Sequence, residues 1–259
     1  MQVTGNTLLI TGGGSGIGRA LAEAFHRRGN QVIIAGRRED TLRQVAQANP
    51  GMKTAQLDLQ DPKGIERFAA RMAEEYPQLN AVLNNAGIMQ MEDWAADEVD
   101  LSTAEATVAT NLLAPMRLTA ALLPQLKRQP HSTVLTVSSG LAFLTLAHTP
   151  AYSATKAAIH AFSDALRYQL RHTPVDVIEI VPPYVATELM GEQQANDPNA
   201  MPLAEFIDEV MSILETQPNA REVLVKRVYP LRFAAEQGYE QYMEQFHTFN
   251  DRFGAGHLG

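Results

Sequence analysis

Cysteine is absent from this sequence of 259 residues. Its absence excludes disulfide bonds, thiol nucleophiles and metal sites built on thiolates, and a reducing cytoplasm is the simplest expected location. The seven histidines show no HExxH motif or comparable ligand spacing, so we expect no catalytic metal.

Excess positive charge and long apolar runs are absent as well. The chain carries 21 Lys and Arg against 29 Asp and Glu, a formal net charge of −8, and no basic run is suited to tracking phosphates. The N-terminus has no basic region before an apolar stretch, and no apolar run approaches the ~18 residues of a membrane span. We therefore expect a cytoplasmic protein that binds neither nucleic acid nor a membrane.

Short apolar runs do occur, and they alternate with longer helical patterns. The predicted strands are 7–10, 31–35, 54–59, 81–84, 132–137, 175–181 and 222–225. The predicted helices are near 17–29, 41–48, 62–76, 101–128, 151–172 and 203–215, and Thr41 with Gln44 matches a capping box at the second of them. This alternation predicts an α/β fold, a single Rossmann-like domain over 1–259 with a doubly wound parallel sheet of about seven strands.

Two C-terminal regions fall outside that alternation. The stretch 187–202 is polar and contains Gly, Pro and Asn, so we predict a long loop that makes 187–215 a substrate-loop region. The segment 234–259 has the composition of a helical tail, with aromatic residues for packing, for a partner or for covering a pocket. These aromatic residues are Phe233, Tyr239, Tyr242, Phe246 and Phe249.

A glycine-rich turn, TGGGSGIGRA at 11–20, follows the first strand and opens the first helix. It overlays a P-loop until Arg19 and Ala20, where Lys and Ser or Thr should follow, so a magnesium hydroxyl ligand is missing. It is no strict G-x-G-x-x-G either; the spacing at Gly12, Gly16 and Gly18 makes the turn one residue longer. By itself the turn is compatible with a bound pyrophosphate or with no ligand.

Further motifs occur in order along the chain. Asn84, Asn85, Ala86 and Gly87 end the fourth strand, Asn111 lies in the long helix that follows, Ser139 follows the fifth strand, and Tyr152 and Lys156 form a Y-x-x-x-K pair. Together with the glycine spacing, these motifs resemble the short-chain dehydrogenase/reductase family from about residue 6 to 188. The resemblance implies an oxidoreductase that transfers a hydride between a nicotinamide and a carbonyl or secondary alcohol.

The chemistry of such a reaction requires an acid/base near the substrate oxygen. A tyrosine hydroxyl has an unperturbed pKa of ~10, and a lysine four residues later on a helix shares its face and can favour the tyrosinate. The resemblance assigns the acid/base role to Tyr152, ribose binding to Lys156, substrate positioning to Ser139 and a proton-relaying water to Asn111. His160 lies one turn after Lys156, and we interpret it as a satisfied helix histidine.

The end of the second strand bears on the choice of cofactor. Gly36 occupies the position where NAD-binding folds usually place a carboxylate, and Arg37 and Arg38 follow it. A guanidinium can fork onto a 2′-phosphate, so we expect NADP(H) to be preferred over NAD(H). The alternative is that both arginines are solvated loop charges, with Glu39 and Asp40 as candidate partners. The resemblance places the cofactor against Gly12, Gly14, Ser15, Gly16, Ile17, Gly18, Arg37, Arg38, Asp58, Leu59, Asn85, Ala86, Gly87, Tyr152, Lys156, Pro182, Val185 and Thr187.

The substrate side has weaker signals. Pro183 replaces a glycine usual in the family and removes an N–H and backbone freedom before Thr187. Candidate pocket walls are Ile88, Met89, Met91, Leu141, Phe143, Leu144, Leu189 and Met190. They favour an uncharged, apolar carbonyl or alcohol substrate. We expect a homodimer or homotetramer that pairs through 101–128 and 151–172. The alternative function is a catalytically silent NADP(H)-binding regulatory protein.

Overall fold

A seven-stranded, all-parallel sheet forms the centre of the computed structural model, which describes residues 1–254. The strands are β1 (Thr7–Thr11), β2 (Gln31–Gly36), β3 (Lys53–Gln56), β4 (Leu79–Asn84), β5 (Ser132–Val137), β6 (Val175–Val181) and β7 (Glu222–Leu224). Their order is β3-β2-β1-β4-β5-β6-β7, which reverses direction between β1 and β4. This confirms the predicted doubly wound sheet, and ligands bind such sheets at the reversal. The interpretation of 1–259 as one domain stays a prediction.

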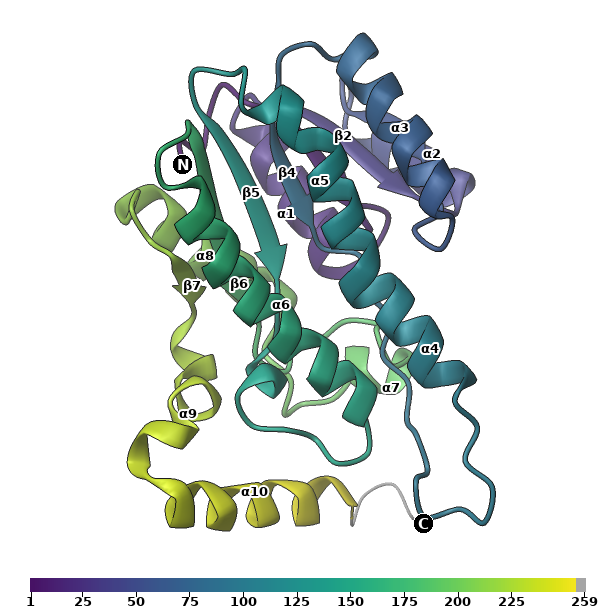
Figure 1. Ribbon diagram of the computed structural model, residues 1–259, viewed down its shortest axis with the longest axis vertical. Coiled ribbons are helices and arrows are strands. Elements are labelled where there is room, and N and C mark those ends of the chain that lie inside the picture. Colours follow the sequence, from purple (N-terminus) through teal and green to yellow (C-terminus); the bar gives the residue numbers. More distant parts are fainter. Residues whose placement is uncertain (255–259) are drawn as a thin grey trace.

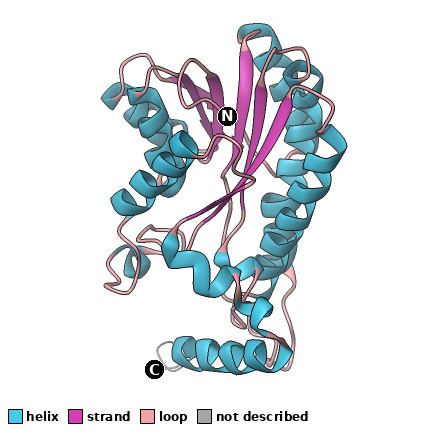
Figure 2. Cartoon of the chain, turned by 90° about the vertical axis from the view of Figure 1, so that its left-hand side faces the viewer, coloured by secondary structure: helices cyan, strands magenta, loops and turns pink. Residues whose placement is uncertain are grey.

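Helices cover both faces of the sheet (Figure 2). One layer contains α1 (Gly16–Arg27), α2 (Glu39–Ala48) and α8 (Leu203–Thr216), and the other contains α3 (Pro62–Glu75), α5 (Ala114–Leu126) and α6 (Pro150–Leu170). Successive residues of a strand point to opposite faces: Leu8 and Ile10 pack in the first layer, and Leu9 packs in the second. Because both faces of the central strands are buried, β1 and β2 contain continuous apolar runs, whereas the edge strand β3 (KTAQ) has no buried residue.

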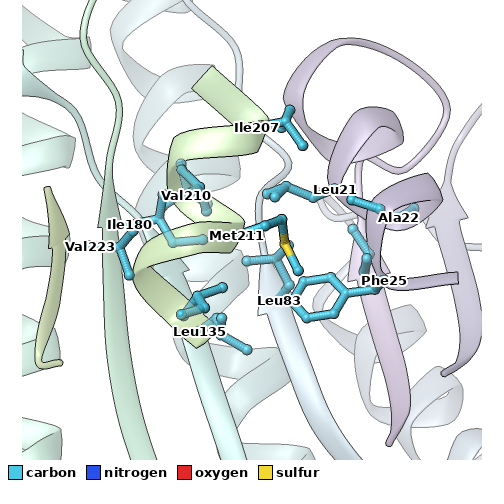
Figure 3. Packing of buried hydrophobic residues seen from close by; sticks show 14 of the residues in the cluster. Leu21, Ala22, Phe25, Leu83, Leu135, Ile180, Ile207, Val210, Met211 and Val223 are labelled. Atoms are coloured by element: carbon cyan, nitrogen blue, oxygen red, sulfur yellow. The ribbon is translucent and has the colours of Figure 1, made fainter. Parts of the chain in front are cut away.

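The core beneath α8 shows how α1, α8 and the sheet pack together. Met211 of α8 points toward Phe25 of α1 and Leu83 of β4, and all three side chains are buried (Figure 3). The flexible thioether of Met211 fills the irregular space between two helices and the sheet. Packing at this density holds the carboxyl ends of β1 and β4 in a fixed relation beside the glycine-rich turn.

Two predicted boundaries were wrong. The helix after β2 begins at Glu39 with Arg38 as its N-cap residue and no side-chain cap, so the predicted capping box at Thr41 does not form. Glu39 and Asp40 occupy the first turn instead, where acidic side chains interact favourably with the helix dipole. The third strand ends at Gln56, which leaves Asp58 in the turn that follows it.

The helix predicted over 101–128 is interrupted. It consists of α4 (Ser102–Val108), a π-helical segment η1 (Ala109–Leu113) and α5. Pro115 has no N–H to bond the carbonyl four residues earlier, and the N–H of Ala114 bonds Ala109, five residues back. By length and mean hydropathy the stretch Ser102–Leu126 could cross a membrane, and 44% of the most apolar 18-residue window of this stretch is buried. Its second half, α5, packs against α3 and the sheet as a core helix. The cytoplasmic location stays a prediction.

The C-terminal quarter contains short helices and one longer helix. Within the predicted loop lie α7 (Glu192–Ala195) and a bridge between Val185 and Met201. The chain then forms η3 (Lys226–Val228), α9 (Tyr229–Arg232), η4 (Ala234–Gln237) and α10 (Tyr239–Gly254). Helix α10 crosses beneath the carboxyl ends of the strands, outside both helix layers (Figures 1 and 2). Of the predicted 234–259 tail, residues 255–259 lie outside the described residues.

Candidate active site

A cleft of about 480 Å³ lies at the carboxyl ends of the strands, at the reversal of strand order. All the residues that the sequence analysis assigned to the cofactor line it, from Arg37 and Arg38 at one end to Tyr152 and Lys156 at the other. Ser139 also lines the cleft, and Asn111 lies behind it, bonded to the backbone of Ile88. Their contacts with a cofactor stay a prediction.

Close packing of the glycine-rich turn leaves no room for side chains at three positions, Gly12, Gly13 and Gly18, of which Gly13 would place a Cβ 2.5 Å from the Ile34 side chain. A Cβ at Gly12, which has a φ of 68°, would lie 2.9 Å from the Asn85 amide nitrogen. A Cβ at Gly18 would lie 2.3 Å from the same nitrogen and 2.4 Å from the Gly12 carbonyl oxygen. The turn thus brings bare backbone and the N-terminus of α1 to the cleft, an arrangement that fits a pyrophosphate group.

Thr11 connects this turn to the segment after β4. Its hydroxyl oxygen accepts hydrogen bonds from the backbone N–H groups of Asn85 and Ala86, each at 3.1 Å. The Asn85 side-chain amide donates to the Thr11 carbonyl at 3.0 Å. These bonds tie the ends of two adjacent strands together, so the Asn-Asn-Ala-Gly motif supports the floor of the cleft.

Arg37 and Arg38 are exposed at the β2 end of the cleft. Arg43 forms the ion pairs with Glu39 and Asp40, so Arg37 and Arg38 do not pair with these two acids, and the alternative that both are solvated loop charges stays open. In residues 1–254 neither guanidinium has an ion-pair partner. Thr41, which sequence reasoning missed as a cleft residue, lies beside Gly14 at this end, five residues after Gly36.

Tyr152 and Ser139 meet at the other end of the cleft. Ser139 accepts a hydrogen bond from the Leu141 N–H at 3.1 Å, which leaves its hydroxyl hydrogen free to point at Tyr152. Burial raises the pKa of Tyr152 to about 12, although the hydrogen bond from Ser139 opposes the rise. The phenol is therefore protonated at neutral pH, the form that donates a proton.

Lys156 lies on the same face of α6, one turn after Tyr152. Its Nζ donates to the Val137 carbonyl at 2.8 Å and lies 5.4 Å from the centroid of the Tyr152 ring. Burial lowers the pKa of Lys156 to about 8, and the Glu179 carboxylate opposes this shift. The predicted lowering of the Tyr152 pKa by Lys156 was wrong, because burial of the phenol dominates and the ammonium is held at Val137.

Asn111 enters the site through the π-helical segment. Its carbonyl oxygen accepts from the Ile88 N–H at 2.9 Å, and its amide donates to the Ile88 carbonyl at 2.8 Å. A Cβ at Gly87 would lie 3.3 Å from this Asn111 oxygen and 3.7 Å from Lys156 Nζ. The extra residue of a π turn rotates Asn111 into this position, a common device at functional sites.

His160 belongs to a charged cluster behind the site. Its Nδ1 lies 2.8 Å from Glu179, which is fully buried on β6, and the hydrogen bond to Glu179 raises the pKa of His160. Arg232 forks onto Glu222 at 2.8 and 2.9 Å. His160, Glu179 and Glu222 are spaced like metal ligands, but within the described residues His160 bonds Glu179 and Arg232 forks onto Glu222. The interpretation of His160 as a satisfied histidine is confirmed.

A second cavity, of about 140 Å³, adjoins Tyr152 on the side away from the glycines. Of the predicted wall residues, Met89, Met91, Leu141, Leu189 and Met190 line this cavity, and Ile88 lines the cofactor cleft. Phe143 and Leu144 do not line the cavity, so the prediction for these two residues was wrong. The 3₁₀ turn η2 (Gly140–Ala142) directs the chain away from the cavity, and the Phe143 ring packs on His160. Phe249, one of the tail aromatics expected to pack, to meet a partner or to cover a pocket, lines this cavity, whereas Tyr184, Leu231 and Phe253 are among the wall residues that sequence reasoning missed.

Comparison with known proteins gives concordant matches. The family profile described as short chain dehydrogenase matches residues 6–198. The uncharacterized oxidoreductase DltE of Bacillus subtilis is 39% identical over 251 residues, covering 96% of this chain and 99% of that protein.

Solved structures share the fold. A short chain dehydrogenase from Burkholderia cenocepacia in complex with NADP has a TM-score of 0.82 at 24% identity, covering 95% of this chain and 99% of the other. A short chain dehydrogenase/reductase from Burkholderia phymatum in complex with NAD has a TM-score of 0.79 at 16% identity, covering 95% and 96%. The fold therefore occurs with both nicotinamide cofactors.

Proposed function

The chain belongs to the short-chain dehydrogenase family, oxidoreductases that act on C–OH or C=O groups with a nicotinamide cofactor, and we propose that it is an NADP(H)-dependent reductase of an uncharged carbonyl compound, or dehydrogenase of the corresponding alcohol. One observation carries the proposal: Tyr152, Ser139 and Lys156 converge where the glycine-lined cleft meets the apolar cavity.

Proton delivery is the task of Tyr152. The bound nicotinamide would supply or accept the hydride at the carbonyl carbon. Negative charge then develops on the carbonyl oxygen, and Tyr152, protonated because its pKa is about 12, can donate its proton there. The Ser139 hydroxyl, already oriented by the Leu141 N–H, can donate a hydrogen bond to the same oxygen.

Lys156 and Asn111 support this step. With a pKa of about 8, Lys156 is mainly an ammonium at neutral pH, and its N–H groups can donate hydrogen bonds to ribose hydroxyls. The Asn111 carbonyl oxygen uses one lone pair on Ile88 and retains another that can accept from a water beside Lys156.

The preference for NADP(H) rests on Arg37 and Arg38. Both are exposed at the edge of the cleft without ion-pair partners in the described part of the chain, and no carboxylate replaces Gly36. A 2′-phosphate would gain charge-assisted hydrogen bonds there. Arg37, which directly follows Gly36, is the principal candidate.

Self-association through α4, η1 and α6 is also part of the proposal. Val108 and Leu113 are exposed on the first two elements. Ala154, Ala157 and Ala161 of α6 are exposed small residues that permit close helix approach. We expect a homodimer or homotetramer, which light scattering after gel filtration would test; a monomer at micromolar concentration would contradict it.

The decisive experiment follows the absorbance of NADPH mixed with the protein and a panel of ketones, aldehydes and diones. Tyr152→Phe should reduce kcat by about 10²–10⁴-fold, because general acid catalysis contributes that much, while the NADPH dissociation constant changes little. Consumption at the wild-type rate by Tyr152→Phe would refute the role of Tyr152. NADPH binding without consumption of any compound would favour the regulatory alternative.

A further inference from the structure

The outer wall of the 140 Å³ cavity is built from segments far apart in the sequence. Phe249 and Phe253 of α10 line it, with their ring centroids 5.0 Å apart. Tyr184, which follows the unusual Pro183, packs edge-on against Phe253 at 6.1 Å. These three aromatic side chains lie opposite Ser139 and Tyr152, which also line the cavity.

Asn250 fixes α10 in this position. Its side-chain oxygen accepts from the Ala147 N–H at 2.6 Å, and its amide donates to the Thr145 carbonyl at 3.1 Å. Both partners belong to the loop that runs from η2 to α6, between Ser139 and Tyr152. One side chain therefore joins the C-terminal helix to the loop that connects the two proposed catalytic groups.

Tyr184 is held independently of α10. Its hydroxyl donates to Asp197 at 3.1 Å, and its carbonyl accepts from the Met201 N–H at 2.8 Å. The Tyr184 ring is thus anchored from the loop after β6, while Phe249 and Phe253 line the cavity from α10.

We propose that Tyr184, Phe249 and Phe253 form an aromatic cap, clasped by Asn250, that restricts the substrate to an uncharged carbonyl compound whose larger substituent is about the size of a benzene ring. Size follows from the volume: an apolar cavity of about 150 Å³ holds benzene, and this one is about 140 Å³. Charge follows from the lining, whose titratable side chains among the described residues include Asp197 and His148 but no Lys or Arg, so the Asp197 carboxylate disfavours a second carboxylate in the cavity. The cap rests on the proposed function for the identity of the reacting group.

Three ketones test the cap in a complex that cannot turn over, the protein saturated with whichever oxidised nicotinamide nucleotide it binds. Acetophenone has a phenyl substituent, 2-acetonaphthone adds a second ring, and 4-acetylbenzoate adds a charge. Ligand-observed NMR titration should give acetophenone at least about tenfold tighter binding than either other probe, because pockets discriminate single groups by this much. Equal binding of acetophenone and 2-acetonaphthone, or no binding of acetophenone, overturns the cap.

Variants then locate the size limit. Phe249→Ala and Phe253→Ala should reduce the preference for acetophenone over 2-acetonaphthone by about tenfold. Asn250→Ala should also reduce this preference, because it removes the hydrogen bonds to Thr145 and Ala147 that hold α10 in place. Phe246→Ala is the matched control, because Phe246 lies on α10 stacked with Tyr242 and does not line the cavity. An unchanged preference in both cap variants, or an equal change in the control, overturns the assignment. Phe253→Leu, with its fold checked by circular dichroism, replaces any variant that does not fold.

Turnover separates this inference from the proposed function. If acetophenone binds with the expected size limit but NADPH is not consumed, the proposed reaction fails and the cap stands. If NADPH is consumed with 2-acetonaphthone as fast as with acetophenone, the reaction stands and the cap fails.

Discussion

On the cofactor side of Tyr152 the cleft is shaped by backbone, whereas on the substrate side the cavity is shaped by side chains. Gly12 and Gly18 allow the turn after β1 to touch the segment after β4, over a few residues at strand ends. The substrate cavity instead depends on Phe249 and Phe253, which reach it from a helix clasped to a distant loop by Asn250. A backbone-built site tolerates few changes, and a side-chain-built site can change its ligand without changing the fold.

Gly18→Ala should have the largest effect, confined to the cofactor side. The new Cβ would lie 2.3 Å from the Asn85 amide and 2.4 Å from a backbone oxygen, so no rotamer relieves the clash. Overpacking of this kind costs about 1–3 kcal/mol, and the upper end corresponds to more than a hundredfold loss of NADPH affinity.

Gly36→Ala is the matched control in the same cleft, because its Cβ would meet only Leu42, at 3.8 Å. Fluorescence titration of NADPH measures both variants. Equal affinity of Gly18→Ala and wild type would show that the turn relaxes and that the cofactor side is less rigid than described.

Arg232→Ala tests the charged cluster behind the site, which depends on side chains as the substrate cavity does. It removes the guanidinium that forks onto Glu222 and leaves this carboxylate beside the fully buried Glu179. Breaking a buried pair costs about 3–5 kcal/mol, and because Arg232 and Glu222 are 19% and 20% exposed we expect about 2 kcal/mol of lost stability. Urea denaturation measures it.

The double variant Arg232→Met with Glu222→Met should recover much of that stability, because an apolar pair leaves no charge unpaired. Arg43→Ala, which removes exposed ion pairs, should leave stability nearly unchanged. A loss in Arg43→Ala as large as in Arg232→Ala would refute the distinction between the two networks.

Arg37→Ala should weaken NADPH binding by about tenfold and leave NADH binding unchanged. A hydrogen bond to a charged group contributes about 1.5–3 kcal/mol, and exposure to solvent reduces that figure. Arg43→Ala serves again as the nearby control, since Glu39 and Asp40 already occupy Arg43. Tighter binding of NADH than of NADPH by the wild type would overturn the cofactor preference.

The same contrast explains how much the sequence alone predicts. The strands and their alternation were predictable because each depends on a local pattern of apolar runs, and the residues along the cofactor cleft followed from the family resemblance that the glycine spacing and the later motifs carry. The π turn that presents Asn111 was missed although Pro115 marked it. The contacts of Glu179 with His160, and of Asn250 with Ala147, join residues with no shared pattern, so only the packed chain brings them together.

The smallest expected effect is a pH shift that connects the two sides through Lys156. The proposed role of Lys156 in holding the cofactor ribose uses the ammonium. Burial lowers the pKa of Lys156 from 10.5 to about 8, so kcat/KM should fall as pH rises above about 8. Tyr152, with a pKa of about 12, stays protonated over this range. Glu179→Gln removes the carboxylate that raises the Lys156 pKa, so the fall of kcat/KM should begin at lower pH. Glu222→Gln keeps Glu179, so the fall of kcat/KM should occur at the same pH as in the wild type. The same pH dependence in the wild type, Glu179→Gln and Glu222→Gln would make Glu179 a purely structural residue.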